Sequence, residues 1–461
     1  MNAIVFSAIW GVVMMFTGLF VKNNRIVRLT AIAGLALLLL LNIQDMRGIH
    51  LFDVDVKGML SFETFGLLFN SIAFSCTLIY FILSGRDIEQ VGMHVAEYFA
   101  LLFFILCGVS IASSFNTLLM LFLGIEIISI PLYILTGSDK RNLKSNEASL
   151  KYFLMGSFST GLMLMGIALI YGAKGSFVME AIALGNSDLT PMLSAGLLLL
   201  LFSMAFKVSA APFHFWTPDV YDGAPTVFTS FMATIVKAAA FIAFLRLFEG
   251  CFGDMQPQWQ LPVAIITAAT LLIGNITAVF QQSVKRMLAY SSIAQAGFMM
   301  LALVSLNGRA KEGLIFYAAA YSLATIGVFA VLIKMKDYTF EGFNGLGKRE
   351  PVLAAANTVF LLSLAGIPAT AGFMAKFYML SATIANGRVF WLVILAIGCA
   401  AISVYYYFRV IQAMYFKEGE EEHAIATTPV FKVILGLVAI VLIVLGLFPQ
   451  WLLDNLYNPG F

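Results

Sequence analysis

The chain has 461 residues, of which 61% are hydrophobic and only 11% are charged, and its mean hydropathy is +0.93. This composition excludes a soluble multidomain protein and indicates a polytopic membrane protein. The net charge of +2 points to no nucleic-acid partner, because the lysines and arginines fall in short connecting loops.

Apolar segments of about 20 residues, bounded by charged residues, Asn, Gly or Pro, predict 14 membrane spans and an all-α fold. In chain order their predicted limits are 2–21, 26–44, 59–84, 93–112, 114–136, 146–171, 191–213, 224–249, 261–281, 285–305, 312–335, 351–385, 388–415 and 429–452.

Positive charges in the loops predict the orientation of these spans. If the N-terminus lies outside, the inner loops hold 14 lysines and arginines and the outer loops hold six. The inner set is Lys22, Arg25, Arg28, Arg86, Lys140, Arg141, Lys144, Lys285, Arg286, Lys334, Lys336, Lys348, Arg349 and Lys417; the outer set is Arg47, Lys57, Lys174, Arg309, Lys311 and Arg388. Because cytoplasmic loops carry the excess of positive charge, we expect both termini outside the cytoplasm.

Two of the predicted spans, 191–213 and 351–385, run into helix breakers. The breakers are Pro212, Pro218, Gly223 and Pro225 at the first span, and Gly366, Pro368 and Gly372 in the second. Proline frees a carbonyl, and non-helical backbone at membrane depth needs protein or water to satisfy it. The two breaks therefore predict hydrated cavities.

The broken spans are five helices apart, so they enter the membrane in opposite directions, as in an inverted repeat. We therefore predict a three-helix segment over residues 1–92, repeat 1 over 93–249, an inverted repeat 2 over 250–415 and a C-terminal helix over 416–461. The alternative is that Pro and Gly are simply common in membrane helices.

Four ionisable residues lie near the middle of long apolar segments: Glu126, Lys207, Lys237 and Lys376. A charge at the bilayer centre costs roughly 3 kcal/mol, so each of them requires a partner, water or a role in proton transfer. One carboxylate and three amines together favour proton movement.

Glu126 and Lys207 are natural partners. At about 4 Å and an effective dielectric constant near 20, their attraction is about 4 kcal/mol. Lys207 then keeps its proton while the pair is intact and can release it when Glu126 moves away. The alternative is a static ion pair that only fixes helix packing.

Lys237 has no acidic residue within four positions and lies among alanines, which predicts internal water around its amine. Lys376 follows Gly372 in the second broken span and is a candidate for the terminal proton carrier. A tilted helix would instead let Lys376 extend its amine to the membrane surface.

Other polar residues are weaker candidates. Lys151 either extends to the surface or modulates Lys207, and His214 is either structural or a proton relay. Ser292 and Gln295 lie at helical spacing and either carry a water chain or bond neighbouring helices.

The sequence predicts no cofactor or metal in this chain. Its four cysteines are scattered through apolar segments without CxxC spacing, which favours packing roles. A P-loop, a GxGxxG motif after a strand and an HExxH motif are all missing from the sequence.

Three segments carry a resemblance to a known family. The stretches KVSAAPFHFWTPDVYDGAPT (207–226), KRMLAYSSIAQAG (285–297) and AGIPATAGFMAKF (365–377) resemble the antiporter-like subunits of proton-pumping NADH:quinone oxidoreductase, respiratory complex I. The stretch PDVYDGAPT is similar to the subunit N type rather than to the L and M types. The wider family also includes subunits of Mrp-type cation/proton antiporters.

The resemblance implies roles for residues and partners. It matches the family's glutamate in helix 5 to Glu126, and its lysines in helices 7, 8 and 12 to Lys207, Lys237 and Lys376. It further implies a bacterial inner membrane, with both termini on the periplasmic side, and partners among other complex I subunits, both antiporter-like and small helical ones. NAD, FMN, iron–sulfur clusters and quinone are then expected on other subunits.

The chain departs from the family pattern at two positions. Val227 follows GAPT where the family usually has Pro, and Gln295 stands where the family commonly has His. Because glutamine does not titrate, a relay through that position requires water.

Three functions remain open from the sequence. The first is a pumping subunit in which a proton passes from Lys207 through Lys237 to Lys376, with Glu126 setting the charge of Lys207. The second is an Mrp-type cation/proton antiporter subunit, and the third is a structural membrane scaffold.

Overall fold

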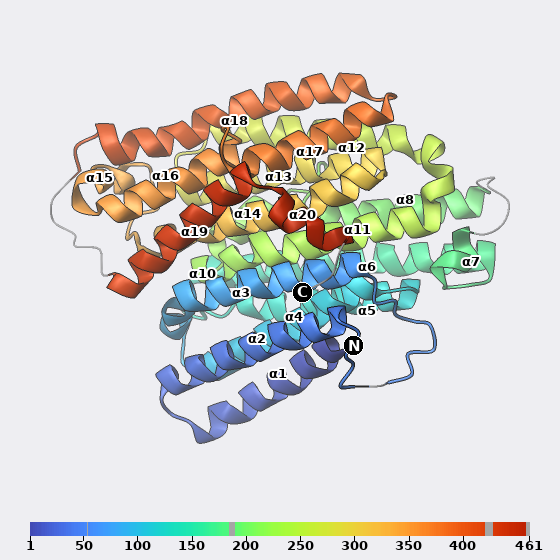
Figure 1. Cartoon of the computed structure of the whole chain (residues 1–461), viewed down its shortest axis with the longest axis horizontal. Helices are drawn as coiled ribbons and strands as arrows, with labels where there is room; N and C mark the ends of the chain where they lie inside the picture. Colours follow the sequence, from blue (N-terminus) through green and yellow to red (C-terminus); the bar gives the residue numbers. More distant parts are fainter. Residues whose placement is uncertain (53, 184–189, 420–426, 458–461) are drawn as a thin grey trace.

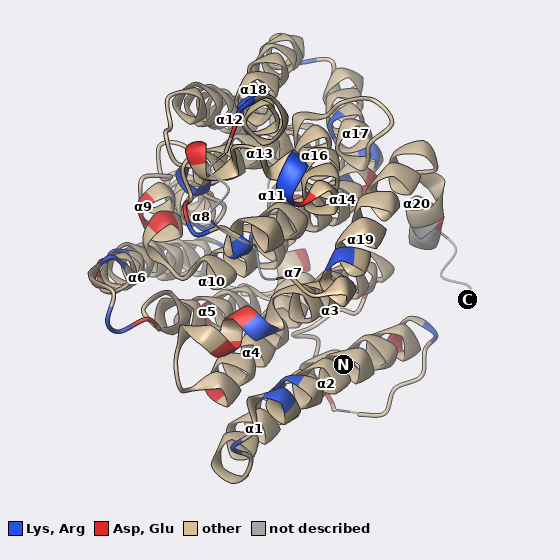
Figure 2. Cartoon of the chain, turned by 90° about the vertical axis from the view of Figure 1, so that its left-hand side faces the viewer, with Lys and Arg blue, Asp and Glu red and all other residues tan. Residues whose placement is uncertain are grey.

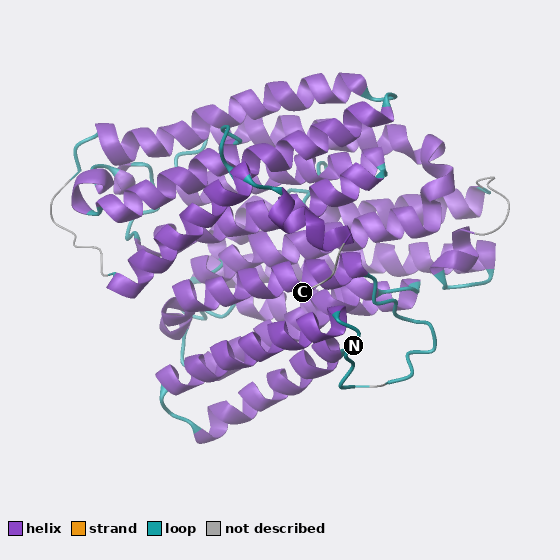
Figure 3. Cartoon of the chain, in the orientation of Figure 1, coloured by secondary structure: helices purple, strands orange, loops and turns teal. Residues whose placement is uncertain are grey.

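The structure, a computed structural model, describes residues 1–52, 54–183, 190–419 and 427–457. Long helices run side by side through one bundle (Figure 1). Most of these helices are joined by short loops, with a longer one between α2 and α3, and no strand is drawn in the described residues (Figure 3). The observed fold is therefore the all-α helical architecture that the composition predicts.

The N-terminal segment lies at one edge of the bundle. It comprises α1 (Asn2–Phe20), α2 (Asn24–Met46) and α3 (Thr64–Val91). The amino group of Met1 pairs with Asp45 at 3.1 Å, so the start of α1 lies beside the end of α2. The α1–α2 pair projects from the rest of the molecule when the bundle is viewed end-on (Figure 2).

The middle of the chain supplies the first broken helix. Its elements are α4 (Val95–Ser114), α5 (Leu118–Thr136), α6 (Leu143–Lys174), α7 (Met179–Ala183), α8 (Pro191–Lys207), α9 (Trp216–Gly223), α10 (Thr226–Phe231), the π-helical turn η1 (Met232–Val236) and α11 (Lys237–Phe252). Side-chain caps set several starts: Thr117 accepts a hydrogen bond from the Met120 amide, and Thr190 accepts one from the Leu193 amide.

The last part of the chain supplies the second broken helix. Its elements are η2 (Gly253–Met255), α12 (Gln256–Val279), α13 (Val284–Ser305), α14 (Gly308–Lys334), η3 (Glu341–Phe343), α15 (Leu346–Arg349), α16 (Pro351–Ala365), α17 (Ala371–Asn386), α18 (Phe390–Phe416), α19 (Pro429–Leu447) and α20 (Gln450–Tyr457). The apolar windows of α13 and α14 are almost wholly buried, whereas most of α1 is not. The core of the bundle therefore lies around α13 and α14.

Eleven helical segments in the described residues are long and apolar enough to cross a membrane. One of them, Thr226–Val279, is 54 residues long and runs from α10 through α12. The broken helices contribute the shorter apolar helices α8 and α16. The count of 14 spans stays a prediction, as do the inverted repeats and the four-part division of the chain.

Both predicted helix breaks are present. After α8, residues 208–215 are non-helical, Ser209 has a φ of 65°, and the amide of Ala211 donates to the hydroxyl of Thr270 at 2.9 Å. After α16, Gly366 has a φ of 84° and ends the helix, and α17 begins five residues later. A side-chain hydroxyl from a neighbouring helix thus satisfies part of the freed backbone, as the membrane interior requires.

Candidate functional site

The four charged residues come from four separate helices. Glu126 lies in α5, Lys207 ends α8, Lys237 begins α11 and Lys376 lies in α17. Lys237 is 2% exposed and Lys376 6%, and the side chains of Lys207 and Glu126 are 8% and 19% exposed. Burial of this degree means that each amine depends on nearby protein oxygen atoms or water.

Glu126 and Lys207 lie together, as their sequence positions predict. The amine of Lys207 is 3.6 Å from Oε1 of Glu126 and donates a shorter hydrogen bond, 3.0 Å, to the hydroxyl of Ser129. Glu126 in turn accepts a hydrogen bond of 2.7 Å from Thr160. At an effective dielectric constant near 20 the attraction between the two charges is about 5 kcal/mol before desolvation is counted.

The break after α8 shapes the surroundings of Lys207. Because Lys207 is the last residue of α8, its positive charge lies at the helix end that carries partial negative charge. The preceding carbonyl, that of Phe206, accepts a hydrogen bond of 3.2 Å from the indole of Trp216. The non-helical turn is thereby folded back against the end of α8.

Lys237 is held by α13. Its amine donates to the backbone carbonyl of Ser292 at 2.9 Å and to the Ser292 hydroxyl at 3.0 Å, and it lies 5.8 Å from the ring centroid of Tyr221. The sequence predicts water around this amine, whereas the structure supplies two protein oxygens. The π-helical turn η1 ends directly before Lys237, and such turns are frequent at functional sites.

Lys376 closes the second break. Its amine donates to the carbonyl of Ala365, the last residue of α16, at 2.8 Å and lies 4.8 Å from the ring centroid of Phe298. The last carbonyls of a helix lack intrahelical partners. Lys376 therefore satisfies a backbone group that the break leaves free and points inward rather than to the membrane surface.

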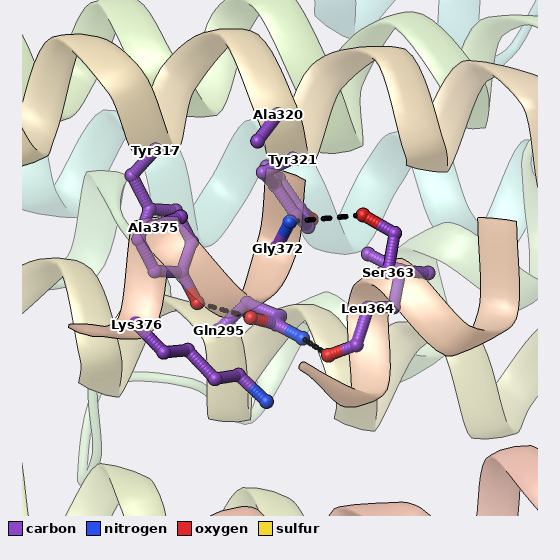
Figure 4. Close-up of a pocket in the computed structure, with 9 residues that line it drawn as sticks. All are labelled: Gln295, Tyr317, Ala320, Tyr321, Ser363, Leu364, Gly372, Ala375 and Lys376. Carbon is purple, nitrogen blue, oxygen red and sulfur yellow. Dashed lines mark hydrogen bonds between the residues drawn. The ribbon is translucent and has the colours of Figure 1, made fainter. Parts of the chain in front are cut away.

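Gln295 belongs to α13, and its side chain reaches the end of α16 at the second break (Figure 4). Its amide nitrogen donates to the carbonyl of Leu364 at 3.0 Å and to the hydroxyl of Tyr407 at 3.2 Å, and its oxygen accepts from the hydroxyl of Tyr317. A cavity of about 10 Å³ separates Gln295 from Lys376. This volume is space for about one water molecule.

The polar contacts of Lys237 and those around Lys376 both involve residues of α13. Ser292 and Gln295 are three residues apart in α13, and their partners Lys237 and Leu364 belong to α11 and α16. Leu364 is adjacent in sequence to Ala365, which accepts from Lys376. Aromatic rings lie near Lys207 and Lys237: the ring of Trp216 is 5.3 Å from that of Phe206, the neighbour of Lys207 in the chain, and 6.1 Å from that of Tyr221, between centroids.

Lys151 belongs to a charged cavity at α9. It pairs with Glu147 at 2.7 Å and with Asp219 at 2.9 Å, and Asp219 also pairs with Arg286 at 3.1 Å. Partial burial of Asp219 opposes its ionisation, but hydrogen bonds from Lys151 and Arg286 outweigh it and hold the pKa of this carboxyl below its ordinary value. The cavity measures about 160 Å³ and is also lined by Asp222. A modulating effect of Lys151 on Lys207 stays a prediction.

His214 lies inside the first break and is 5% exposed. Its ring packs against that of Phe215 at 4.5 Å between centroids. Within the described ranges, no hydrogen bond or ion pair joins it to any of the four charged residues. Its role as a relay stays a prediction.

Several polar partners are missed by sequence reasoning. Ser129 follows Glu126 by three residues, a spacing that places both on one helix face, so its signal was present in the sequence. Thr160 gives no such signal. Lys285, which the sequence places among the loop cations, is 4% exposed and donates to the carbonyls of Asp222 and Ala224, both at 2.8 Å.

No cluster of three His, Cys, Asp or Glu side chains suited to a metal ion is found in the described part of the chain. The four cysteines, Cys76, Cys107, Cys251 and Cys399, are free and buried. Their environment matches the packing role that their spacing indicates.

Comparison with known proteins gives consistent matches. The sequence model described as "NADH:quinone oxidoreductase/Mrp antiporter, TM" matches residues 115–403. NADH-quinone oxidoreductase subunit N from Cytophaga hutchinsonii is 44% identical over 404 residues, with 86% of this chain and 87% of that protein covered. The protein of the same name from Flavobacterium psychrophilum is 39% identical, with 99% and 100% covered. A chain of respiratory complex I from Thermus thermophilus with bound aureothin superposes with a TM-score of 0.86 and 32% identity, with both chains fully covered.

Proposed function

Because the chain belongs to the NADH:quinone oxidoreductase/Mrp antiporter family of membrane subunits, we propose that it is a proton-translocating subunit of an NADH:quinone oxidoreductase. It lies in a bacterial inner membrane among other antiporter-like and small helical subunits. NADH oxidation and quinone reduction take place on other subunits, which carry FMN and iron–sulfur clusters. This chain contributes buried amines and the groups between them.

Two observations support this proposal: Lys237 contacts Ser292, and Lys376 shares a small cavity with Gln295, one helical turn further along α13. Lys237 donates to Ser292, Gln295 donates to Leu364, and Lys376 donates to the adjacent Ala365. Amines are proton carriers, and hydrogen-bonded groups with one water molecule between them form a path for a proton. Since Gln295 does not titrate, that step requires a water molecule, for which the cavity beside Lys376 has space.

Glu126 controls the charge of Lys207. At 3.6 Å its carboxylate favours the protonated amine, and a small displacement weakens that attraction. Glu126 is the most exposed of the four charges, so a neighbouring subunit has access to it. Quinone chemistry elsewhere in the complex thereby changes the distance between Glu126 and Lys207. This change determines when Lys207 releases its proton towards Lys237.

Protons enter from the cytoplasmic side near α9. The charged cavity lined by Lys151, Asp219 and Arg286 lies at the helix that follows the first break, close in the sequence to Lys207. With both termini outside the cytoplasm, this end of the bundle carries the positive loops, and Figure 2 shows Lys and Arg at this end on helices and on the loop before α6. Lys376 then passes the proton outward.

The direct test is proton pumping by assembled complexes that carry Lys207→Met or Glu126→Gln. Removal of a positioned proton carrier slows transfer by about 100-fold or more, so NADH-driven proton uptake into proteoliposomes should lose the share that this chain carries. Lys311→Met, which removes an amine that pairs with Glu249 and is 42% exposed, serves as the matched control and should pump normally. Normal pumping by assembled Lys207→Met contradicts the proposal.

Assembly of these variants tests the scaffold alternative, and a separate experiment on the purified chain tests the antiporter alternative. Failure of both variants to assemble, with pumping intact in whatever complex forms, favours a structural scaffold. Cation-driven proton exchange by the purified chain in vesicles, without any electron-transfer partner, favours an antiporter.

A further inference from the structure

A large cavity lies away from the four charges, between the N-terminal helices and the C-terminal helices. It measures about 570 Å³ and is lined by residues of α2, α3, α14, α19 and α20. In the end-on view of Figure 2, α2 lies on one side of this region and α19 and α20 lie on the other. Its volume is within the range of sites that bind small molecules.

The walls of the cavity are apolar along most of their length. The residues that α3 contributes begin at Leu68 and end at Ile79, and α14 contributes Ala319 and Leu323. Covering such a surface with an apolar group is favourable, because it removes apolar surface from water. Ligands with a hydrocarbon part therefore fit this cavity, and small polar molecules do not.

One end of the cavity is positively charged. Arg47, which directly follows α2, lines the cavity and is exposed. No ion pair joins Arg47 to an acidic side chain among the described residues. A guanidinium group binds phosphate through paired hydrogen bonds, so this end of the cavity suits a phosphate group.

The length of the cavity distinguishes a lipid from a transmembrane helix. Eleven residues separate Leu68 from Ile79, which corresponds to about 16 Å along a helix. The hydrocarbon core of a bilayer is about 30 Å thick, so one leaflet accounts for about 15 Å. A transmembrane helix needs a groove through both leaflets, whereas an acyl chain needs one.

We propose that this cavity binds an anionic phospholipid of the leaflet on the side of Met1, with its phosphate at Arg47 and an acyl chain between α3, α14 and α19. The pairing of Met1 with Asp45 places Arg47 on that side of the membrane. The bound lipid fills the space between α2 and the C-terminal helices α19 and α20, beside the direct contacts that α3 makes with α14, α19 and α20. This site is independent of the proton path.

The test uses the assembled protein in vesicles that contain a phospholipid with a photoreactive group on its acyl chain. Phosphatidylglycerol serves as the anionic probe and phosphatidylcholine as the zwitterionic one. We expect several-fold more labelling of the peptide 58–86, which contains most of α3, by the anionic probe, and Arg47→Gln should abolish that preference. Arg388→Gln, at an exposed arginine in another turn, should leave it unchanged.

Filling the cavity provides the second arm. Ala319→Phe and, independently, Ser75→Phe place a ring in the cavity and should reduce labelling of this peptide by either probe. Leu437→Phe, at a position of α19 that is 55% exposed, should not. Equal labelling by both probes that survives Ala319→Phe or Ser75→Phe overturns the proposal, and so does crosslinking of the peptide to another subunit in place of lipid.

Discussion

At the scale of single residues, each buried amine is stabilised by oxygen atoms that belong to common residue types. Lys237 binds Ser292, Lys207 binds a serine hydroxyl beside its glutamate, and Lys376 binds a backbone carbonyl. Neutral partners keep the amine inside without fixing its charge as firmly as a carboxylate does. Of these three amines, only Lys207 has an acidic partner among the described residues, which is why the proposed charge control is placed at the Glu126 pair.

Replacing Gln295 tests whether the proton passes this position through water or through a side chain that titrates. Gln295→Leu leaves the carbonyl of Leu364 without its donor, at a cost of about 1–3 kcal/mol, and removes the polar edge of the small cavity. We expect slower NADH-driven proton uptake for this variant. Gln295→His restores a titratable group and should pump at least as well as the unaltered chain, with a dependence on pH near neutrality.

The comparison of these two variants in assembled complexes, as proton uptake per NADH oxidised, gives a clear answer. If Gln295→Leu and the unaltered chain pump equally, no proton passes beside residue 295.

The four charges could be predicted from the sequence because charged residues are rare in apolar segments, so their positions are informative. Among their hydroxyl partners, Ser129 is marked by its helical spacing from Glu126, but Thr160 carries no such signal because threonine is frequent in membrane helices. Ser292 was a candidate, but its bond to Lys237 depends on how α11 and α13 pack. The burial of Lys285 likewise depends on α9, which lies far from it in the sequence.

At the scale of elements, the two breaks place lysines at helix ends. Lys207 is the last residue of α8, and Lys376 reaches back to the last carbonyl of α16. The two breaks could be predicted from the sequence because proline and glycine interrupt helices. The π-helical turn before Lys237 could not be predicted from the sequence, because no residue type specifies such a turn.

Gly366 is the residue on which the second break depends most directly. Its φ of 84° disfavours other residues, and a β-carbon there would lie 2.9 Å from Cδ of Lys376. We therefore expect Gly366→Ala to cost about 1 kcal/mol or more in backbone strain and to displace the amine, which lowers pumping.

Gly398→Ala is the matched control for this variant, because a β-carbon at Gly398 in α18 meets no atom within 4 Å. Proton uptake and the yield of assembled complex should be unchanged for Gly398→Ala. Equal pumping by both alanine variants would show that the geometry of the break does not position Lys376.

At the scale of the whole molecule, the bundle brings together residues from widely separated segments of the sequence. Lys237 of α11 contacts Ser292 of α13, and Gln295 of α13 shares a cavity with Lys376 of α17. Hydropathy predicted the class of fold, because length and apolar composition determine which segments can cross a bilayer. It could not predict the large cavity beside α3, which depends on where the N-terminal and C-terminal helices meet.

Lys237 tests the central claim most directly, since it is buried, lies between the two broken helices and has only neutral oxygen partners among the described residues. The measurement is NADH-driven proton uptake per NADH oxidised in proteoliposomes that contain assembled complexes with Lys237→Met. The proposed path predicts a lower ratio than that of the unaltered complex, because the central carrier is missing. An unchanged ratio in a fully assembled complex would contradict it.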